Sequence, residues 1–275
     1  MANFTLENVK ALRENLGTGM VDTKNALVEA DGDMDKAIEI LRLKGAKGNA
    51  KRADRSTSEG LVAAKEIGTT AYMIELACET DFVAKGDKFV VLADKVLNAI
   101  AAAGATTVEA GLAAAAGSQT VAELIDGEAA IIGEKFELRR VAAVTGESFS
   151  IYLHKTSKDL PPQVGVVLGF SGTDVETARS VAQHISFANP EYLAASDVPT
   201  ELVETERKIV TEISKNEGKP EAALPKIVEG RVKAYLKQVA LLEQDYAKDN
   251  KLSVAKVLDD AQLTVSGFAR FKVGA

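Results

Sequence analysis

The segment ELACETDFVAK, residues 75–85, combines residue types that can act on another molecule. An apolar, strand-like run is followed by a polar turn in which the acidic Asp81 stands beside the aromatic Phe82. A carboxylate is a ligand for hard cations such as Mg²⁺, whose octahedral shell tolerates little displacement of its waters and ligands. Asp81 is therefore a candidate for disturbing a bound Mg²⁺ ion.

Phe82 allows two interpretations. Large rings are usually buried, so Phe82 can be the first core residue after the strand, packed near Phe89 of the following helix. Alternatively, Phe82 is held at the tip of the turn and inserts into an apolar pocket of another protein, which contributes about 1.5–3 kcal/mol. The pattern alone leaves both interpretations open.

Cys78, His154 and His184 are the only cysteine and histidines of the chain. A catalytic Cys and His pair needs Cys78, but a lone cysteine in an apolar run is more typical of an inert core residue. A metal site of several imidazoles is excluded. His184 precedes Ile185 on an amphipathic helix and is expected to pack or cap at the edge of its apolar stripe. His154 ends a strand-like run, where it either serves a partner surface or has no task.

The sequence lacks the motifs of the common nucleotide, metal and hydrolase sites. It contains no GxxxxGK[ST] loop, no GxGxxG after a strand, no HExxH, no CxxC and no GxSxG. The chain is therefore expected to have no nucleotide site, no cofactor and no small-molecule substrate of its own.

Composition indicates a protein partner. The chain of 275 residues is 46% hydrophobic and carries a net charge of -7, which does not suit general binding of nucleic-acid phosphates. The start MANFTLENVKALREN lacks the apolar run of a signal peptide, and the single cysteine suits a reducing compartment. The most apolar segment, residues 99–117, is rich in Ala and Gly and too weakly hydrophobic for a membrane span. A cytoplasmic protein without direct nucleic-acid or membrane binding is expected.

Residues 1–45 are predicted to form a small module of three short helices. The sequence GTG at residues 17–19 separates the first helix from the second. Asp33 can cap the third helix and Gly45 is expected to follow its end. The apolar stripe of the third helix has helical spacing and comprises Met34, Ala37, Ile38 and Leu41. So small a bundle suits a docking module better than a catalytic one.

A basic linker is predicted for residues 46–59. The basic residues around it are interleaved with Gly, Ala and Ser but with no aromatic residue: Arg42, Lys44, Lys47, Lys51, Arg52 and Arg55. An RNA contact is one interpretation. Without rings for base stacking, a solvated and partly helical hinge is the other, and the pattern favours it.

The core is predicted to consist of two related α+β subdomains with antiparallel sheets. The first, residues 60–145, begins with a hairpin that turns at Gly68 and Thr69, followed by an amphipathic helix that ends near Gly104. The second comprises residues 146–190 and 240–275. The segment KFELRRVAAVTGESFSIYLHK is expected to form a second hairpin, VGVVLGFSG a further strand, and GFARFKVG a strand that returns to the sheets. Strand, polar turn and helix thus recur as a degenerate repeat.

Residues 191–239 are predicted to form a protruding antiparallel helical hairpin. The turn NEGKP reverses the chain between two helices rich in charge, which leaves only a narrow apolar seam. The residues expected on this seam are Leu202, Ile209, Ile213, Ile227, Tyr235 and Val239.

Two of these segments carry a family resemblance. TDFVAK at residues 80–85 and LRENLGTGMVDTKNAL at residues 12–27 closely resemble the two signature regions of bacterial translation elongation factor Ts. The similarity extends over essentially the whole chain, including VEGRVK at residues 228–233 and the closing GFARFKVG. The resemblance implies an α+β fold whose amino-terminal module is UBA-like.

The resemblance also implies a function. In that family the protein is the guanine nucleotide exchange factor for elongation factor Tu, the GTPase that carries aminoacyl-tRNA to the ribosome. It binds the GDP form, disturbs the Mg²⁺ and phosphate site, and makes and breaks no covalent bond. The implied residues for dislodging Mg²⁺ are Thr80, Asp81, Phe82 and Val83, with Phe82 wedged between helices of the GTPase domain. The implied partner-binding residues are Arg13, Met20, Val21, Asp22, Lys24 and, toward the third domain of the partner, His154.

Three classes of function make different forecasts. An exchange factor accelerates release of GDP from elongation factor Tu, and an interaction protein of unknown partner binds without changing that rate. A thiol enzyme loses its activity when Cys78 is changed to Ser, a substitution that exchange tolerates.

Overall fold

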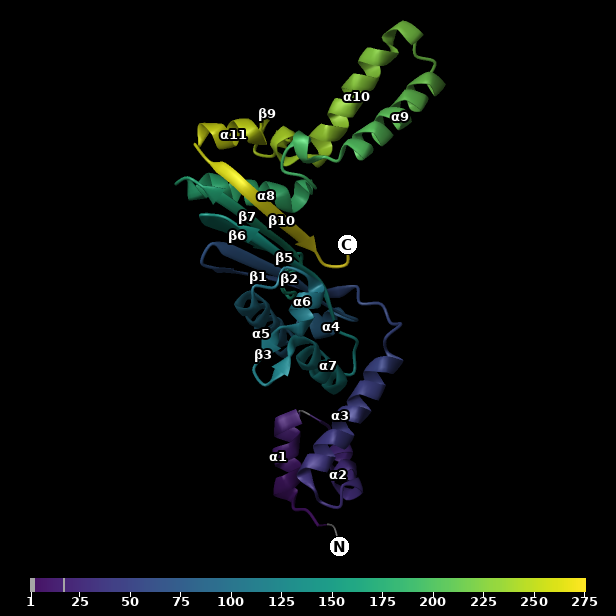
Figure 1. The fold of residues 1–275 in the computed structure, drawn as a ribbon, viewed down its shortest axis with the longest axis vertical. Coiled ribbons are helices and arrows are strands. Elements are labelled where there is room, and N and C mark those ends of the chain that lie inside the picture. The colour runs from purple at the N-terminus through teal and green to yellow at the C-terminus, as the bar shows by residue number, and fades with distance from the viewer. Residues whose placement is uncertain (1–2, 17) are drawn as a thin grey trace.

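The computed structural model describes residues 3–16 and 18–275. Figure 1 shows three parts in a row: helices α1 to α3 at the end that carries the N-terminus, two sheets with their helices in the middle, and the projecting helices α9 and α10 at the far end. Residue 17, the first of the predicted GTG break, lies outside the described residues. The α+β class with antiparallel sheets is confirmed.

The amino-terminal part contains three helices, α1 (Leu6–Leu16), α2 (Met20–Glu29) and α3 (Met34–Lys51). Asp33 caps α3 as predicted, because its carboxylate accepts hydrogen bonds from the backbone N–H groups of Asp35 and Lys36. The buried residues shared by the three helices are Val9, Leu12, Ala26, Leu27, Ala30, Ala37 and Leu41.

The prediction that the third helix ends before Gly45 is wrong, since α3 continues through Gly45 to Lys51. A Cβ atom added to Gly45 would lie 3.0 Å from Cβ of Ala130 on helix α7 (Val121–Ile132). Asn49 also donates a hydrogen bond of 2.8 Å to the carbonyl of Asp126. Gly45 therefore permits a close approach of two helices, a use of glycine that local sequence cannot distinguish from a helix stop.

Two three-stranded antiparallel sheets form the centre. The first has the order β1 (Glu59–Ile67), β2 (Thr70–Cys78), β5 (Glu137–Thr145), and the second has the order β10 (Thr264–Lys272), β7 (Val164–Ser171), β6 (Ser148–His154). The hairpin of β1 and β2 and the return of β10 to a sheet are confirmed.

The second predicted hairpin is wrong. β5 pairs with β2 in the first sheet and β6 pairs with β7 in the second, so the chain changes sheet between Thr145 and Ser148. The close approach of the sheets at this crossing depends on small residues, because a Cβ on Gly146 would lie 3.1 Å from Cα of Gly169. Two strands joined by a short connection look like a hairpin in the sequence. Only the packing of the sheets places the two strands in different sheets.

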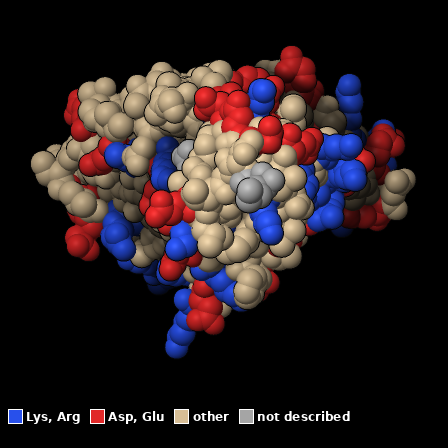
Figure 2. Space-filling view, turned by 90° about the horizontal axis from the view of Figure 1, so that it is seen from below, with Lys and Arg blue, Asp and Glu red and all other residues tan. Residues whose placement is uncertain are grey.

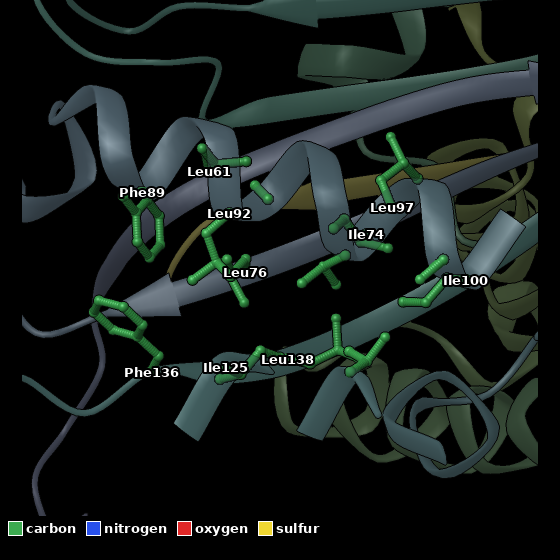
Figure 3. Packing of buried hydrophobic residues seen from close by; sticks show 14 of the residues in the cluster. Leu61, Ile74, Leu76, Phe89, Leu92, Leu97, Ile100, Ile125, Phe136 and Leu138 are labelled. Carbon is green, nitrogen blue, oxygen red and sulfur yellow. The ribbon is translucent and has the colours of Figure 1, made fainter. Parts of the chain in front are cut away.

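Helices cover the outer face of the first sheet. α5 (Asp87–Ala103) ends before Gly104, as predicted. Gly104 adopts the left-handed conformation that commonly ends a helix. Figure 3 shows Phe89, Leu92, Leu97 and Ile100 of α5 directed toward the strands. The other elements of this layer are α4 (Asp81–Ala84), α6 (Val108–Ala113), β3 (Ala115–Ala116), β4 (Gln119–Thr120) and α7.

The second sheet carries its own layer, in which α8 (Val175–Ala188) packs on the faces of β6 and β7. The remaining elements are β8 (Asp245–Tyr246), β9 (Asp249–Ser253), α11 (Val254–Asp260) and the 3-10 helices Ala195–Asp197, Glu221–Ala223 and Leu241–Glu243. The inner faces of the two sheets meet in a cluster that includes Val62, Ala71, Met73, Val144, Val167 and Phe271. β2 is therefore buried on both faces.

α9 (Thr200–Asn216) and α10 (Leu224–Val239) lie side by side and project from the core (Figure 1). The predicted seam is wrong on both helices. Leu202, Ile209 and Ile213 of α9 are exposed. Ile227, Tyr235 and Val239 of α10 lie outside the cluster that packs between the helices. The residues that pack between the helices are Val203, Val210, Val228, Val232 and Leu236. Two apolar sets with the same spacing, one residue apart, occur in α9, and only the partner helix selects between them. No helix among residues 3–16 and 18–275 has the length and hydropathy that crossing a membrane requires.

Candidate functional site

The TDFV segment (residues 80–83) joins the end of β2 to the short helix α4. Thr80 is the N-cap of α4, with an extended backbone, and its hydroxyl oxygen accepts a hydrogen bond of 3.3 Å from the N–H of Val83. Threonine is a preferred residue for this position because its side chain satisfies an N–H that the helix leaves free. The cap places Asp81 and Phe82 in the first turn of the helix.

The first turn directs its side chains in opposite directions. Val83 is half-buried against the apolar cluster between the first sheet and its helices, and Ala84 is fully buried. Phe82 is 76% exposed, and Asp81 is exposed as well. Lys85 lies 3.6 Å from the Asp81 carboxylate and its Nζ is 5.5 Å from the centre of the Phe82 ring. The interpretation of Phe82 as a core residue is therefore wrong. An aromatic ring and a carboxylate stand together on the surface.

The residues expected to bind a partner from the amino-terminal part are all exposed: Arg13, Met20, Val21, Asp22 and Lys24. Four of them lie in the first half of α2, and Arg13 reaches that helix start by donating a hydrogen bond of 3.4 Å to the carbonyl of Thr18. Lys44 of α3 lies 2.6 Å from Asp22. The structure thus brings the five residues to one end of the three-helix part, with Met20 and Val21 as its apolar surface.

His154 is exposed at the end of β6. Its Nδ1 lies 3.0 Å from the hydroxyl of Tyr152, and the two rings stack with centroids 6.0 Å apart. The imidazole is held by its neighbour on the same strand face and lies at the surface.

These candidate residues do not converge on one pocket. Figure 1 shows α2 in the part near the N-terminus and α4 in the middle of the molecule, beside the sheets. Around the amino-terminal end, Lys and Arg are interspersed with Asp and Glu over a largely uncharged surface (Figure 2). Residues so spread suit an extended interface with a large partner better than a small-molecule site.

Cys78 does not suit nucleophilic chemistry. It is fully buried at the end of β2, and burial, followed by the nearby Glu134 carboxylate, raises the pKa of its thiol to about 12. The nucleophile is the thiolate, and a thiol with this pKa is not ionised at neutral pH. Cys78 is part of the apolar cluster between the first sheet and α5, as expected for an inert core residue.

His184 packs at the edge of the α8 stripe, as predicted. It is 3% exposed, its Nε2 lies 2.8 Å from Oε1 of Gln244, and its Nδ1 accepts a hydrogen bond from the N–H of Ala247. Because Nδ1 accepts, Nε2 carries the proton and donates to Gln244. Burial lowers the pKa of this imidazole.

Sequence reasoning missed Glu134, whose carboxylate binds the start of the TDFV segment. It lies more than fifty residues further along the chain, after the end of α7. Its neighbours give no pattern that points to this role, and only the fold brings it to Thr80.

Comparisons with known proteins agree with the resemblance of the signature segments. The family model described as Elongation factor TS matches residues 79–275. The chain is 75% identical to Elongation factor Ts of Leifsonia xyli subsp. xyli and 72% identical to that of Clavibacter sepedonicus, in each case over the full length of both chains. Elongation factor Ts of Tropheryma whipplei is 52% identical, again over the full length of both. The chain belongs to the elongation factor Ts family.

Proposed function

We propose that the chain is a guanine nucleotide exchange factor that binds elongation factor Tu in its GDP form and promotes exchange of GDP for GTP during translation elongation. Two observations support this proposal. The chain belongs to the elongation factor Ts family along its full length. The observation that carries the mechanism is the 76% exposure of Phe82 next to the exposed Asp81, in the first turn of a capped helix. The cytoplasm is where such a factor acts.

Phe82 acts as a wedge in this proposal. A ring on the surface has little to gain from its own protein, and inserting it between two helices of the GTPase domain contributes about 1.5–3 kcal/mol. Val83 and Ala84 anchor the same turn in the apolar cluster between the first sheet and its helices, so the ring projects from a rigid base. A rigid base matters, because a flexible loop would fold the ring away instead of displacing the partner's helices.

Asp81 acts on the Mg²⁺ ion that the partner holds with its nucleotide. A carboxylate brought close to the ion competes with the ion's present ligands and waters, and the octahedral shell of Mg²⁺ tolerates little displacement. Thr80 and Val83 set the direction of Asp81 through the cap hydrogen bond. The residues of this chain contribute no covalent step to the exchange.

Linkage explains why such contacts release GDP. A factor that binds the nucleotide-free GTPase better than the GDP form must lower the GTPase's affinity for GDP by the same ratio, because coupling free energy is reciprocal. Nanomolar nucleotide binding corresponds to about 12 kcal/mol, which exceeds what one ring supplies. Several contacts therefore share the effect, and incoming GTP with fresh Mg²⁺ displaces the factor.

The remaining candidate residues supply affinity. Met20 and Val21 offer apolar surface on α2, and Arg13, Asp22 and Lys24 surround them with charge, an arrangement typical of an interface with a polar rim. This surface is assigned to the GTPase domain of the partner and His154 to its third domain. Contacts far from the nucleotide stabilise the complex with and without GDP, so they set affinity more than release rate.

The test is release of fluorescently labelled GDP from elongation factor Tu, followed by stopped flow with increasing amounts of the factor. The wild-type chain is expected to accelerate release strongly. Phe82→Ala is expected to lower the limiting release rate about tenfold or more, from the lost burial of one ring, and to weaken binding to the GDP form less.

Phe187→Ala is the matched control, because Phe187 is 67% exposed on α8, outside the proposed site. It is expected to retain the wild-type release rate. Binding without any change in the release rate would replace the proposal with a plain interaction protein, and loss of activity in Cys78→Ser alone would favour thiol chemistry.

A further inference from the structure

The Glu134 carboxylate receives three hydrogen bonds from the two residues that precede Asp81. Its Oε2 accepts from the backbone N–H groups of Glu79 at 3.2 Å and Thr80 at 3.1 Å, and its Oε1 accepts from the Thr80 hydroxyl at 2.7 Å. The Thr80 hydroxyl thus donates to Glu134 while it accepts from Val83 N–H. The residue that caps α4 is itself held by one side chain from another part of the chain.

These bonds occupy the point where strand pairing stops. β2 ends at Cys78, so the N–H groups of Glu79 and Thr80 have no strand partner, and a carboxylate is a strong acceptor for both. Glu134 is positioned by Gly133, which ends α7 in a left-handed conformation with φ of +87°. The chain therefore turns away from α7 directly before Glu134.

A second set of contacts ties the same two segments together. Oε1 of Glu79 accepts a hydrogen bond of 2.7 Å from the N–H of Lys135, and the Glu79 carboxylate lies 3.1 Å from Arg55. Lys135 Nζ donates to the carbonyls of Ala53 at 2.8 Å and Arg55 at 3.2 Å. Residues 134–135 and 79–80 bind each other reciprocally, and the linker from α3 is attached to this joint.

We infer that Glu134 is a positioning residue for nucleotide exchange, which fixes Thr80 and thereby the direction in which Asp81 and Phe82 project. This inference rests on the proposed function. Glu134 is half-buried with both oxygens engaged by the chain itself, so it acts through Thr80 and not by touching the partner. Without it, α4 keeps its buried residues Val83 and Ala84 and its cap bond, but loses the bonds that hold the capping residue Thr80 in place.

A positioning role and a merely structural role predict different results. Loss of general stability lowers the amount of folded factor and leaves the limiting release rate per folded molecule unchanged. Loss of direction lowers that limiting rate while affinity, which depends on distant contacts, stays nearly constant. Positioned groups lose rate steeply when displaced by about 1 Å.

The experiment measures labelled GDP release from elongation factor Tu against factor concentration for Glu134→Ala, Glu134→Gln and Glu128→Ala. Glu134→Ala is expected to lower the limiting rate about tenfold, with less than about a twofold change in the half-saturating concentration. Glu134→Gln keeps an acceptor for the two N–H groups and is expected to regain most of the rate. Glu128→Ala removes a carboxylate from helix α7 and is expected to match wild type.

A double-mutant cycle with Phe82→Ala separates this inference from the proposed function. If Glu134 acts through the ring, Glu134→Ala adds little to the defect of Phe82→Ala. A normal limiting rate in Glu134→Ala, with a slow Phe82→Ala, overturns the positioning role and leaves the proposed function standing. A normal rate in Phe82→Ala overturns the wedge itself. Should Glu134→Ala fail to fold, Thr80→Val removes the hydroxyl that bonds both Glu134 and the N–H of Val83. A normal limiting rate in Thr80→Val overturns the inference.

Discussion

The carboxylate of Glu75 lies 2.5 Å from Nε of Arg140, on paired positions of β2 and β5. Glu75 is fully buried between the two sheets, and Arg139 lies 3.6 Å from its other oxygen. The same carboxylate accepts a hydrogen bond from the N–H of Gly274, while Arg140 donates to the carbonyl of Lys272. One ion pair thus binds the carboxyl-terminal end of β10 to the first sheet and joins the two layers from which α4 and His154 project.

Glu75→Ala is expected to lower the free energy of unfolding by about 1.5–3 kcal/mol, because it removes the charge-assisted hydrogen bond to the partly buried guanidinium of Arg140. Urea unfolding at neutral pH measures the change. Glu66→Ala, an exposed carboxylate of β1, is the control and is expected to stay within about 0.5 kcal/mol of wild type. A loss below about 1 kcal/mol in Glu75→Ala would mean that the pair does not join the sheets.

Asp81→Asn is expected to slow GDP release when Mg²⁺ is present in excess and to approach the wild-type rate when Mg²⁺ is chelated. The reason is that an amide lacks the negative charge with which the carboxylate competes against the ion's present ligands. Stopped-flow release in the two conditions measures the ratio. Asp87→Asn, also exposed and in the first turn of α5, is expected to behave as wild type in both. An equal defect with and without Mg²⁺ would assign Asp81 a role that does not involve the ion.

Cys78 is expected to react with a thiol reagent at pH 8 only after unfolding, since burial raises its pKa to about 12. Its effect on stability has a definite sign. Between the ordinary pKa of 9.0 and 12 the unfolded thiol ionises and the folded one does not, so stability falls as pH rises. Relative to Cys78→Ser, wild type should lose about 1 kcal/mol per pH unit in that window. Rapid labelling of the folded protein would contradict this.

His184 is expected to make the protein sensitive to acid. Its pKa is lowered by burial, so below the ordinary value of 6.5 the unfolded state binds a proton that the folded state does not, and stability falls as pH falls. His184→Asn does not titrate and should therefore lose less stability than wild type between pH 7 and 5.5. The free energy of unfolding of both proteins, measured at pH 7 and pH 5.5, gives this difference.

Gly165→Ala is expected to destabilise the fold by about 1–3 kcal/mol, because an added Cβ would lie 2.4 Å from Val62 where the two sheets meet. Gly230→Ala is the matched substitution in α10, where an added Cβ has nothing within 4 Å, and should stabilise by about 0.5–1 kcal/mol. Adding Val62→Ala to Gly165→Ala should recover part of the loss. Urea unfolding measures all three, and additive effects of the pair would argue against a close contact between the sheets.

Local patterns predicted most elements, because their signals lie within one turn or one hairpin. Asp33 as a cap, Gly104 as a terminator and the β1 and β2 hairpin follow from neighbouring residues. Gly45 shows the limit: a glycine that follows an apolar stripe looks like a stop, yet here it is the site where α3 meets α7. Which helix approaches a glycine depends on residues far away in sequence.

The two apolar sets of α9 show the same limit. Ile209 and Val210 are adjacent, and each is preceded at helical spacing in α9 by another apolar residue, Leu202 and Val203. Val210 is buried against α10, whereas Ile209 is 48% exposed. The pairing of β5 with β2 instead of β6 is a third case. In each, sequence allows two arrangements of similar local energy, and tertiary packing selects one.

The sequence by itself determined the polar turn after β2, the chemical character of Asp81 and Phe82, and the family resemblance. Only the tertiary structure decided that the Phe82 ring lies outside while Val83 and Ala84 lie inside, and that Glu134 holds Thr80. The physical reason is that exposure and long-range hydrogen bonds depend on which surfaces the whole fold has already covered. The sequence of a four-residue segment does not determine which parts of the fold pack over it.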